Sequence, residues 1–541
     1  MTNEPSEIKL VEEEILKENS NFLRGTLKKE LAEESAKFNG DNSKLLKFHG
    51  IYQQDDRDLR KKLLTEKKEK AYSLMIRTKL PGGKLAAKQY LILDSIADQY
   101  TNKTLRLTTR QTIQYHGVLK KNIKKTVQEI NKLLINSYGA CGDVVRNVMA
   151  PPVSDIDSDY PEDLIKTADE ISNYFLPESR AYYEVWLEDE NGERISDGIE
   201  RIENESIYGK TYLPRKFKIG IGTTFDNSTD IFTQDIGIVA IINNNKIDGF
   251  NVYVGGGLGH HHNKPETYPR LASPLCFCDK KDLLNITEKI VEIQRDFGCR
   301  ENRKHARFKY LIDDKGLDWF KEEIEKRLGF KLNPVYPVNE FKSRDYLGWH
   351  KQKNGDWYLG IFVENGRLKD QEKIQTKSGI RKIVEKFSCN VRISPQQNII
   401  LCDIKEKDKI AIDDIISDSG FYVYGKTLSN LRRNSIACVS MPTCSLAIAE
   451  AERFLPSLIT ELENMGYGGK EVTIRISGCP NSCSRAPVAQ IGMIGTSLNK
   501  YNLYSGGEFN GTKLNKIAKE NVSSEDLAKE IGKLIDLLKE S

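Results

Sequence analysis

Four cysteines in the C-terminal part of the chain fall into two close pairs, and this spacing suits a metal centre. Five residues separate Cys438 from Cys444, and three separate Cys479 from Cys483. Two local pairs can bring four thiolates to one compact centre, as a [4Fe-4S] cluster requires, because each corner iron takes one thiolate. Zinc is an alternative, although its cysteines usually lie about two to four residues apart. Unrelated buried cysteines are the third interpretation, and the spacing favours the cluster.

The remaining cysteines are scattered along the chain, and we interpret them as small buried hydrophobic residues. They are Cys141, Cys276, Cys278, Cys299, Cys389 and Cys402. Ten cysteines in 541 residues are too few for a disulfide scaffold. The first residues are acidic and show no secretory pattern, so we expect a cytoplasmic protein.

A second group of residues concentrates positive charge. Lys216 and Lys218 follow the segment Tyr212 to Arg215 and lie two apart, so on a strand they share one face. Such a pair inside a protein holds an anion, whereas on an exposed edge strand it only prevents aggregation. Further arginines lie in or beside strand-like segments: Arg77, Arg106, Arg110 and Arg146.

Three weaker motifs complete the candidates. The glycines from Gly255 to Gly259 fail the dinucleotide fingerprint but could present backbone N–H groups to an anion, or form a plain turn. We interpret His260 to His262 as a solvated loop, because consecutive histidines cannot all face one ion. His116, on a strand with Gln114, is either a neutral core residue or one that relays a proton or contacts a ligand. No P-loop or flavin motif is evident, so electrons would come from a partner.

The elements that must position these residues form an internal repeat. In the first part we expect a strand from Tyr72 to Leu80, a helix from Leu85 to Tyr100 and a strand from Thr104 to Gly117. Arg106 and Arg392 lie in similar segments 286 residues apart, and Arg146-Asn147 recurs as Arg433-Asn434 after 287. The near-constant offset predicts two copies of one unit facing each other across a pseudo-twofold axis.

Composition narrows the class of protein. Basic residues number 82 and acidic residues 78, and this even balance argues against a dedicated nucleic-acid binder. A mean hydropathy of −0.53, with no apolar run near the ~18 residues of a membrane helix, argues against a spanning segment. Residues 1 to about 44 are charged, mostly helical in pattern and lack an obvious core, so we expect an arm or a partly disordered lead-in.

Longer motifs resemble a known family. ACVSMPTCSLAIAEAERFLPS and ISGCPNSCSRAPVAQIGMIG are similar to the hemoprotein (beta) subunit of assimilatory sulfite reductases, within the siroheme-dependent sulfite and nitrite reductases. LRLTTRQTIQYHGVLKKNIK, RNVMAPP, KTYLPRKFK and GFNVYVGGGLG match the same family in the same order. The resemblance covers roughly Leu45 to the end of the chain.

This resemblance implies a siroheme coupled to a [4Fe-4S] cluster through a shared thiolate. Cys438, Cys444, Cys479 and Cys483 would hold the cluster, with Cys483 also the proximal ligand of the siroheme iron. Arg77, Arg146, Lys216 and Lys218 match the basic residues on the substrate side. Residues expected to contact the macrocycle are Arg106, Arg110, Gln114, His116, Arg215, Arg307, Gln397, Asn398 and Asn481.

The resemblance also implies the reaction, the six-electron reduction of sulfite to sulfide. Its alternative within the family is nitrite reduction to ammonia, against which Lys218 and the interior of the Cys438 to Cys444 loop argue. A non-catalytic zinc-binding module is the alternative from a different class. The electron donor would be an NADPH-dependent flavoprotein or a ferredoxin, and neither nucleic acid nor membrane is expected as a partner.

The fold class expected from the repeat and the resemblance is α+β, with each copy a ferredoxin-like half-domain plus an α/β siroheme-binding lobe. We expect an N-terminal arm over residues 1–70 and ferredoxin-like half-domains over 71–138 and 343–424. The first lobe, with the substrate lysines, would span 139–342, and the second, with the cluster cysteines, 425–541.

Overall fold

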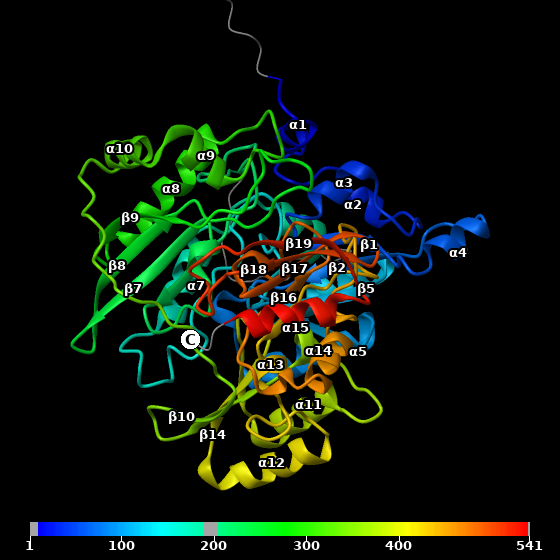
Figure 1. Ribbon diagram of the computed structural model, residues 1–541. Helices are drawn as coiled ribbons and strands as arrows, with labels where there is room; N and C mark the ends of the chain where they lie inside the picture. Colours follow the sequence, from blue (N-terminus) through cyan, green and yellow to red (C-terminus); the bar gives the residue numbers. More distant parts are fainter. Residues whose placement is uncertain (1–8, 189–203, 539–541) are drawn as a thin grey trace, which may run out of the picture.

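The computed structural model describes residues 9–188 and 204–538, and its strands form four sheets arranged as two pairs (Figure 1). One pair comes from the segments that we expected to be ferredoxin-like, and the other from the two lobes. Among the described residues, none of the helices is long and apolar enough to cross a membrane.

The first sheet has the strand order β1-β2-β5-β4-β12. Its strands are β1 (Ile51–Asp55), β2 (Tyr72–Arg77), β5 (Ile113–Val118), β4 (Leu105–Leu107) and β12 (Arg367–Leu368). Helices α5 (Ala87–Tyr100) and α6 (Lys120–Asn131) pack with it. The amphipathic pattern of α6 buries Ile123, Val127 and Ile130, so this helix covers one face of the sheet.

The single strand that we predicted from Thr104 to Gly117 is wrong, because the segment forms the two strands β4 and β5. They pair antiparallel across a turn in which Thr108 N–H donates to Thr112 O at 3.0 Å. Gln111 sits in this turn with a φ of 56°. A residue in the left-handed region cannot continue an extended strand, so the chain reverses there.

The second sheet repeats the first in the order β10-β11-β14-β13-β3. It contains β10 (Gly348–Lys351), β11 (Trp357–Ile361), β14 (Ile399–Ile404), β13 (Asn390–Ile393) and β3 (Lys84–Leu85), with helices α11 (Thr376–Phe387) and α12 (Lys409–Asp418). Gln397 takes a φ of 68° at the place that Gln111 occupies in the first copy. The offset of 286 residues therefore corresponds to a repeated turn as well as repeated strands.

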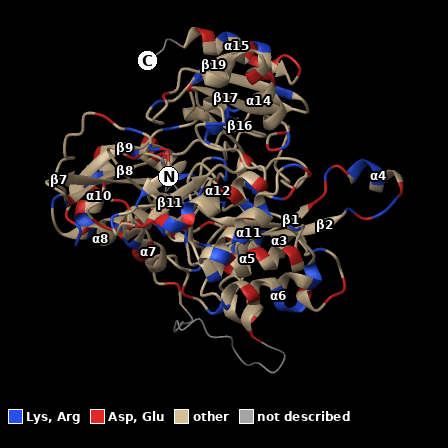
Figure 2. Ribbon diagram, turned by 90° about the horizontal axis from the view of Figure 1, so that it is seen from below, with Lys and Arg blue, Asp and Glu red and all other residues tan. Residues whose placement is uncertain are grey.

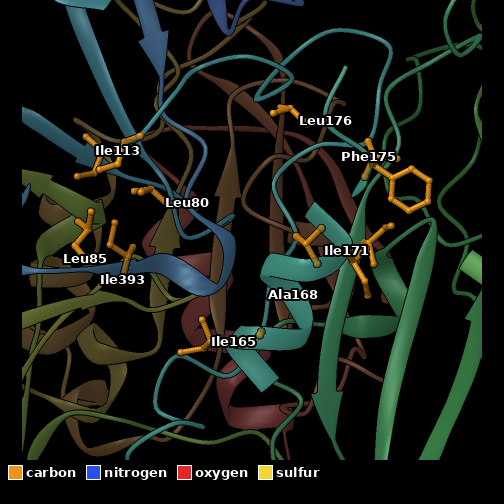
Figure 3. Packing of buried hydrophobic residues seen from close by; sticks show 14 of the residues in the cluster. Leu80, Leu85, Ile113, Ile165, Ala168, Ile171, Phe175, Leu176 and Ile393 are labelled. Atoms are coloured by element: carbon orange, nitrogen blue, oxygen red, sulfur yellow. The ribbon is translucent and has the colours of Figure 1, made fainter. Parts of the chain in front are cut away.

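Each sheet takes its edge strand from the other copy. β12 pairs with β4 through Arg367 and Arg106, and β3 pairs with β13 through Lys84 and Arg392. Figure 3 shows Leu80, Leu85, Ile113 and Ile393 packed together at this junction, beside α7 (Leu164–Tyr174). The exchange makes the two copies one hydrophobic unit rather than two separable domains.

The two lobes also share a strand pattern. In the first lobe β6 (Ile219–Thr223) runs parallel to β7 (Ile236–Asn243), and β8 (Lys246–Val254) and β9 (Ser273–Cys278) follow antiparallel. The second lobe has the order β15 (Ser435–Ala437), β16 (Ile474–Ser477), β17 (Ile491–Ser497), β18 (Lys500–Ser505) and β19 (Lys516–Ser523). Strands β15, β16 and β17 run parallel to one another, and β18 pairs antiparallel with both β17 and β19.

Helices complete both lobes. They are α8 (Leu283–Phe297), α9 (Phe308–Lys315) and α10 (Leu317–Leu328) in the first lobe, and α13 (Asn430–Arg433), α14 (Leu455–Asn464) and α15 (Leu527–Leu537) in the second. In Figure 2 the lobe with β7 to β9 and the lobe with β16 to β19 lie on different sides of the ferredoxin-like sheets. The two lobes thus pack against the ferredoxin-like sheets from different directions.

In the described residues the N-terminal segment forms helices, as its pattern predicts, and the alternative of a partly disordered lead-in is wrong there. Helices α1 (Glu12–Asn19), α2 (Leu27–Leu31) and α3 (Gly40–Leu45) precede β1. Leu23, Leu27 and Leu46 have no exposed surface and belong to the main hydrophobic core. A charged sequence with few apolar residues still folds here, because those few are buried against the first lobe and sheet. Helix α4 (Arg60–Thr65) projects from the body on a short arm (Figure 2).

A buried ion pair joins the strand exchange to the second lobe. Glu452 accepts hydrogen bonds from Arg106 Nε at 2.8 Å and Arg367 Nε at 2.7 Å, the two residues opposite each other on β4 and β12. Burial alone would raise the pKa of Glu452, but Arg367 and Arg106 lower it to about 2. Removing this carboxylate would leave two arginine charges without their counterion.

We therefore expect Glu452→Gln to lower the free energy of unfolding by about 3 kcal/mol, in the range for breaking a buried pair. Urea unfolding of the purified protein measures this change. Because the folded pKa lies below the ordinary value of 4.5, the contribution is complete above pH 4.5 and is lost as the pH falls toward 2. Glu450→Gln, which removes one of the two carboxylate partners of the exposed Arg453, is the control and should change stability little.

Candidate active site

The four paired cysteines follow two neighbouring parallel strands. Cys438 comes directly after β15, and Cys479 lies two residues beyond the end of β16. Carboxyl ends of parallel strands meet at one edge of a sheet, so both cysteine loops start side by side. Gly478 N–H donates to Cys438 Sγ at 3.3 Å, which ties one loop to the other. A Cβ at Gly478 would lie 1.9 Å from Ser440 Oγ, so this crossing of the loops requires glycine.

The shifted pKa values of the thiols reflect how close the four cysteines lie to one another. Burial, followed by the neighbouring Cys483, raises the pKa of Cys438 well above its usual range, and the same two causes raise the pKa of Cys444 to about 11. All four cysteines are free thiols. Within residues 9–188 and 204–538, no three potential ligands converge on a single-ion site. A [4Fe-4S] cluster distributes its thiolates over four irons, so cysteines that surround a space, rather than a point, fit it.

These thiols open into a cavity of about 460 Å³, whose wall is strongly basic. The basic side chains that line it in the described part of the chain are Lys17, Lys44, Lys47, Arg77, Arg106, Arg110, Arg146, Arg215, Lys216, Lys218 and Arg303. The acidic ones are Glu13 and Asp143. Eleven basic residues against two acidic ones mean that the wall carries an excess of positive charge, although the whole chain has a net charge of only +4.

Lys216 and Lys218 face this cavity because the residue between them faces the core. Phe217 pairs with Val145 in a parallel bridge, and both side chains have no exposed surface. Alternation along the extended segment then turns both lysines to the opposite side. In the described residues neither Nζ atom has a hydrogen-bond or ion-pair partner. Burial and then Arg110 lower the pKa of Lys218 to about 7, and burial with Arg215 lowers that of Lys216 well below its usual value.

Arg77 and Arg146 complete the group expected on the substrate side. Arg77 Nη1 donates to Cys141 Sγ at 3.2 Å, and Gln114, with its amide oxygen turned toward it, accepts from Arg77 Nε at 2.9 Å. Arg146 Nε donates to Gly142 O at 2.7 Å. No carboxylate in the described residues pairs with either guanidinium, so their charge remains available to an anion.

The residues expected around the macrocycle divide into two groups. On the cavity wall lie Arg106, Arg110, Gln114, His116, Arg215, Gln397 and Asn481. Arg307 and Asn398 are not placed on that wall. Arg307 Nη2 instead pairs with the buried Asp235 at 3.0 Å, and Asn398 lines a smaller cavity of about 150 Å³ and accepts from Val363 N–H.

Several residues on the wall have polar atoms without partners in the structure. Arg110 Nε and Gln397 Oε1 are buried and form no hydrogen bond within the described residues. Burial followed by Arg146 lowers the pKa of Arg110 to about 9. His116 has a pKa well below its usual value, first because it is buried and then because of Arg367, so its ring is neutral. Buried donors without partners are costly, and a ligand that accepts from them removes this cost.

The glycine and histidine motifs both form backbone hydrogen bonds within the fold. Gly255 N–H and Gly257 N–H donate to Asp235 O and Arg270 O, which favours the turn over an anion site for these two groups. The histidine loop is not simply solvated, because His260 N–H donates to Pro480 O at 3.1 Å. This contact sets the loop against the turn between Cys479 and Cys483.

The sequence analysis missed the part of the wall that comes from the N-terminal segment. This part consists of Glu13, Leu16, Lys17, Lys44, Leu45, Lys47, Phe48, Tyr52 and Gln54. The one available signal was the short apolar run around Leu45 and Leu46, which precedes a strand and is buried. A segment with so few apolar residues gave no reason to expect a cavity wall.

Comparison with known proteins identifies the family. The family description "Nitrite and sulphite reductase 4Fe-4S domain" matches residues 141–332, and "Nitrite/Sulfite reductase ferredoxin-like half domain" matches 66–133 and 350–418. The chain belongs to the nitrite and sulfite reductase family. This membership confirms the predicted fold class, with two ferredoxin-like half-domains, and favours a siroheme with a [4Fe-4S] cluster over a zinc module.

Curated relatives are similar over nearly the whole chain. Proteins named sulfite reductase [NADPH] hemoprotein beta-component are 45% identical in Geobacillus kaustophilus, over 96% of this chain and 91% of the relative. The one in Staphylococcus epidermidis is also 45% identical, over 97% and 91%. The solved structure of the Mycobacterium tuberculosis NirA protein shares the fold, with a TM-score of 0.74 and 22% identity over 94% of this chain and 92% of that one.

The wall fits the cofactors of this family. Siroheme carries eight carboxylates, which arginine and lysine bind through charge-assisted hydrogen bonds. The excess of basic residues on the wall and the unpartnered Arg110 Nε provide donors for such a polyanion. Cys438, Cys444, Cys479 and Cys483 border the same cavity, so both groups have their candidate ligands in one place.

Cys444 is expected to be a ligand of the cluster, so replacing it should lower the metal content more than replacing another partly exposed cysteine. We expect Cys444→Ser to lower the iron and acid-labile sulfide of the purified protein at least severalfold, because a thiolate that completes the cluster is lost. Iron and sulfide assays measure both. Cys299→Ser is the matched control, since Cys299 lies outside the cavity wall and is also partly exposed. Equal iron contents in the two variants would contradict the assignment.

Proposed function

We propose that this chain reduces sulfite to sulfide as the hemoprotein component of an assimilatory sulfite reductase. The balanced reaction takes sulfite, six electrons and seven protons to HS⁻ and three waters. The observation that carries the proposal is one cavity bordered by four cysteines together with Arg77, Arg146, Lys216 and Lys218. The comparisons support it, because relatives that are 45% identical over nearly the full chain are named sulfite reductase hemoprotein beta-component.

The basic residues can perform two tasks on a bound oxyanion. Arg77 and Arg146 stay charged, so they can hold oxygen atoms of the substrate through charge-assisted hydrogen bonds. Lys218, with a pKa of about 7, can both give and regain a proton near neutral pH. When bound, siroheme and the [4Fe-4S] cluster supply the electrons and an iron that takes the sulfur atom. The chain's own residues then orient the oxygens and deliver the protons with which they leave as water.

The proposed assignment of ligands follows the same cavity. Cys438, Cys444, Cys479 and Cys483 hold the cluster, and Cys483 is proposed as the thiolate shared with the siroheme iron. Arg106, Arg110, Gln114, His116, Arg215, Gln397 and Asn481 are proposed to contact the macrocycle. Arg307 and Asn398 lie off this wall and are left out of the proposed contacts to the macrocycle.

The electron donor is proposed to be an NADPH-oxidising flavoprotein. The support is the word NADPH in the names of the relatives, together with the absence of a nicotinamide-binding motif in this sequence. A ferredoxin is the alternative donor. We propose the cytoplasm as the compartment, because the ten cysteines are free thiols, which persist in a reducing environment.

Nitrite reduction to ammonia is the remaining alternative within the family. Lys218 favours sulfite, because nitrite reductases usually carry asparagine at the matching place in the motif. A second ammonium beside Lys216 suits a dianion better than a monoanion. Supplying sulfite and nitrite separately, with a chemical reductant as electron source, and quantifying sulfide and ammonia distinguishes the two activities.

Two variants of Lys218 distinguish its part in binding sulfite from its part in delivering protons. We expect Lys218→Met to reduce the rate of sulfide formation by about 10²-fold or more, the scale of a lost general acid. Lys218→Arg keeps the charge but holds its proton, so it should restore the KM for sulfite more than kcat. Siroheme absorbance serves as the control for cofactor content. Turnover equal to that of the wild type in Lys218→Met would contradict the proposed role.

A further inference from the structure

The chain from Leu46 to Gly50 is held rigidly at the edge of the cavity. His49 Nε2 donates to Leu23 O at 3.0 Å and His49 Nδ1 accepts from Trp186 Nε1 at 2.9 Å. The ring of Phe48 lies 5.4 Å from that of Tyr212, centre to centre. These contacts fix the residues that follow Lys47.

The backbone of the same segment is bonded to the first sheet and the first lobe. Arg77 N–H donates to Gly50 O, and Gly139 N–H donates to Phe48 O, both at 2.9 Å. The backbone around Lys47 is therefore fixed by contacts on both sides, three residues before the carbonyl that Arg77 binds. A ligand that binds Lys47 therefore has to order the side chain but not the backbone that carries it.

Three lysines of the N-terminal segment line the cavity, and two of them have partners. Lys17 Nζ bonds to Glu14 at 2.6 Å and to Leu213 O at 2.8 Å. Lys44 Nζ lies 3.5 Å from Glu12 and 3.8 Å from Asp41. Within residues 9–188 and 204–538, the Nζ of Lys47 has neither a hydrogen bond nor a carboxylate within ion-pair distance.

The charges around Lys47 do not compensate it. Burial comes first among the causes that lower the pKa of Lys47, and Arg303 and Arg215 add to the effect. Asp143 and, more weakly, Glu13 act in the opposite direction, but the Asp143 carboxylate lies 2.7 Å from Arg303 Nη1 and is shared with Arg215, and Glu13 lies 4.0 Å from Arg303 Nε. The ring of Tyr52, 6.0 Å from Nζ, offers only a weak cation–π contact.

From this placement we infer that Lys47 is an additional anion-binding residue of the active site, contributed by the N-terminal segment. It binds an oxyanion within the cavity, and this inference rests on the proposed sulfite reductase function. Two sources have the required chemistry: a peripheral carboxylate of the siroheme, and sulfite on its way to Arg77 and Arg146. Both would satisfy a half-buried ammonium that has no partner in the protein.

The experiment compares full-length Lys47→Met, Lys47→Gln and Lys47→Arg with the wild type. Siroheme per chain is measured from the absorbance of the extracted tetrapyrrole, and KM and kcat for sulfite are measured with a chemical reductant. Inorganic phosphate serves as a nonreactive oxyanion probe, titrated against the visible spectrum of the loaded protein. Lys37→Met is the matched control, because Lys37 lies on the same segment, pairs with Glu69 at 3.1 Å and is outside the cavity wall.

If a siroheme carboxylate is the ligand, the Met and Gln variants should contain severalfold less siroheme, while the loaded fraction keeps its KM. If sulfite is the ligand, siroheme content should stay unchanged, KM should rise about tenfold with a smaller change in kcat, and the affinity for phosphate should fall in parallel. Lys47→Arg should restore either property, because it retains the charge.

Siroheme content, KM and phosphate affinity that all equal those of the wild type in both neutral variants would overturn the inference. So would a loss that Lys47→Arg does not restore, since that result indicates packing rather than charge. Neither result touches the proposed function, which fails only if the wild type lacks siroheme or forms no sulfide. Far-ultraviolet circular dichroism of each variant shows whether it has folded.

Discussion

Repulsion among the basic residues that face one cavity is the interaction on which the rest of the structure depends. Eleven basic side chains and two acidic ones line a space of about 460 Å³, in a chain whose total charge is nearly balanced. Charges of one sign at such density disfavour the folded state unless other groups fix and compensate them. Asp143, Asp235 and Glu452 each hold one or more of the surrounding arginines, and the remaining excess suits a polyanionic cofactor with its anionic substrate.

The internal repeat shows how this charge is confined to one side of the molecule. Because Ile219 opens β6 as Ile474 opens β16, Glu471 and Thr473 stand where the first copy has Lys216 and Lys218. They line the cavity of about 150 Å³, in which Arg433 takes the place of Arg146. Arg433 is bonded there to both Asp345 and Glu471. The second cavity thus neutralises its own charge, whereas the first leaves its charge for a ligand.

Features set by local spacing could be predicted from the sequence, and those set by distant contacts could not. Cysteine spacing and the alternation of Lys216 and Lys218 are short-range patterns, and the structure brings the residues of both together on one cavity wall. The exchange of β3 and β12 could not be predicted, because each is a two-residue strand defined only by its partner. Arg307 lies behind the wall because Asp235, more than 70 residues away, binds it. The N-terminal wall was missed for the same reason, since its few apolar residues are buried only by contact with other parts of the fold.

The four cysteines all belong to the second lobe, yet their positions depend on the whole chain. Thr109, in the turn of the first sheet, donates to Cys483 O at 3.0 Å, and Arg57, beyond β1, donates to Ala447 O. The histidine loop of the first lobe adds its bond to Pro480 O. Each contact is made to a backbone carbonyl, so it fixes the course of a cysteine loop whatever side chains the loop carries. A second lobe folded alone would keep all four thiols but lose these three supports, and with them the course of the cysteine loops along the cavity wall.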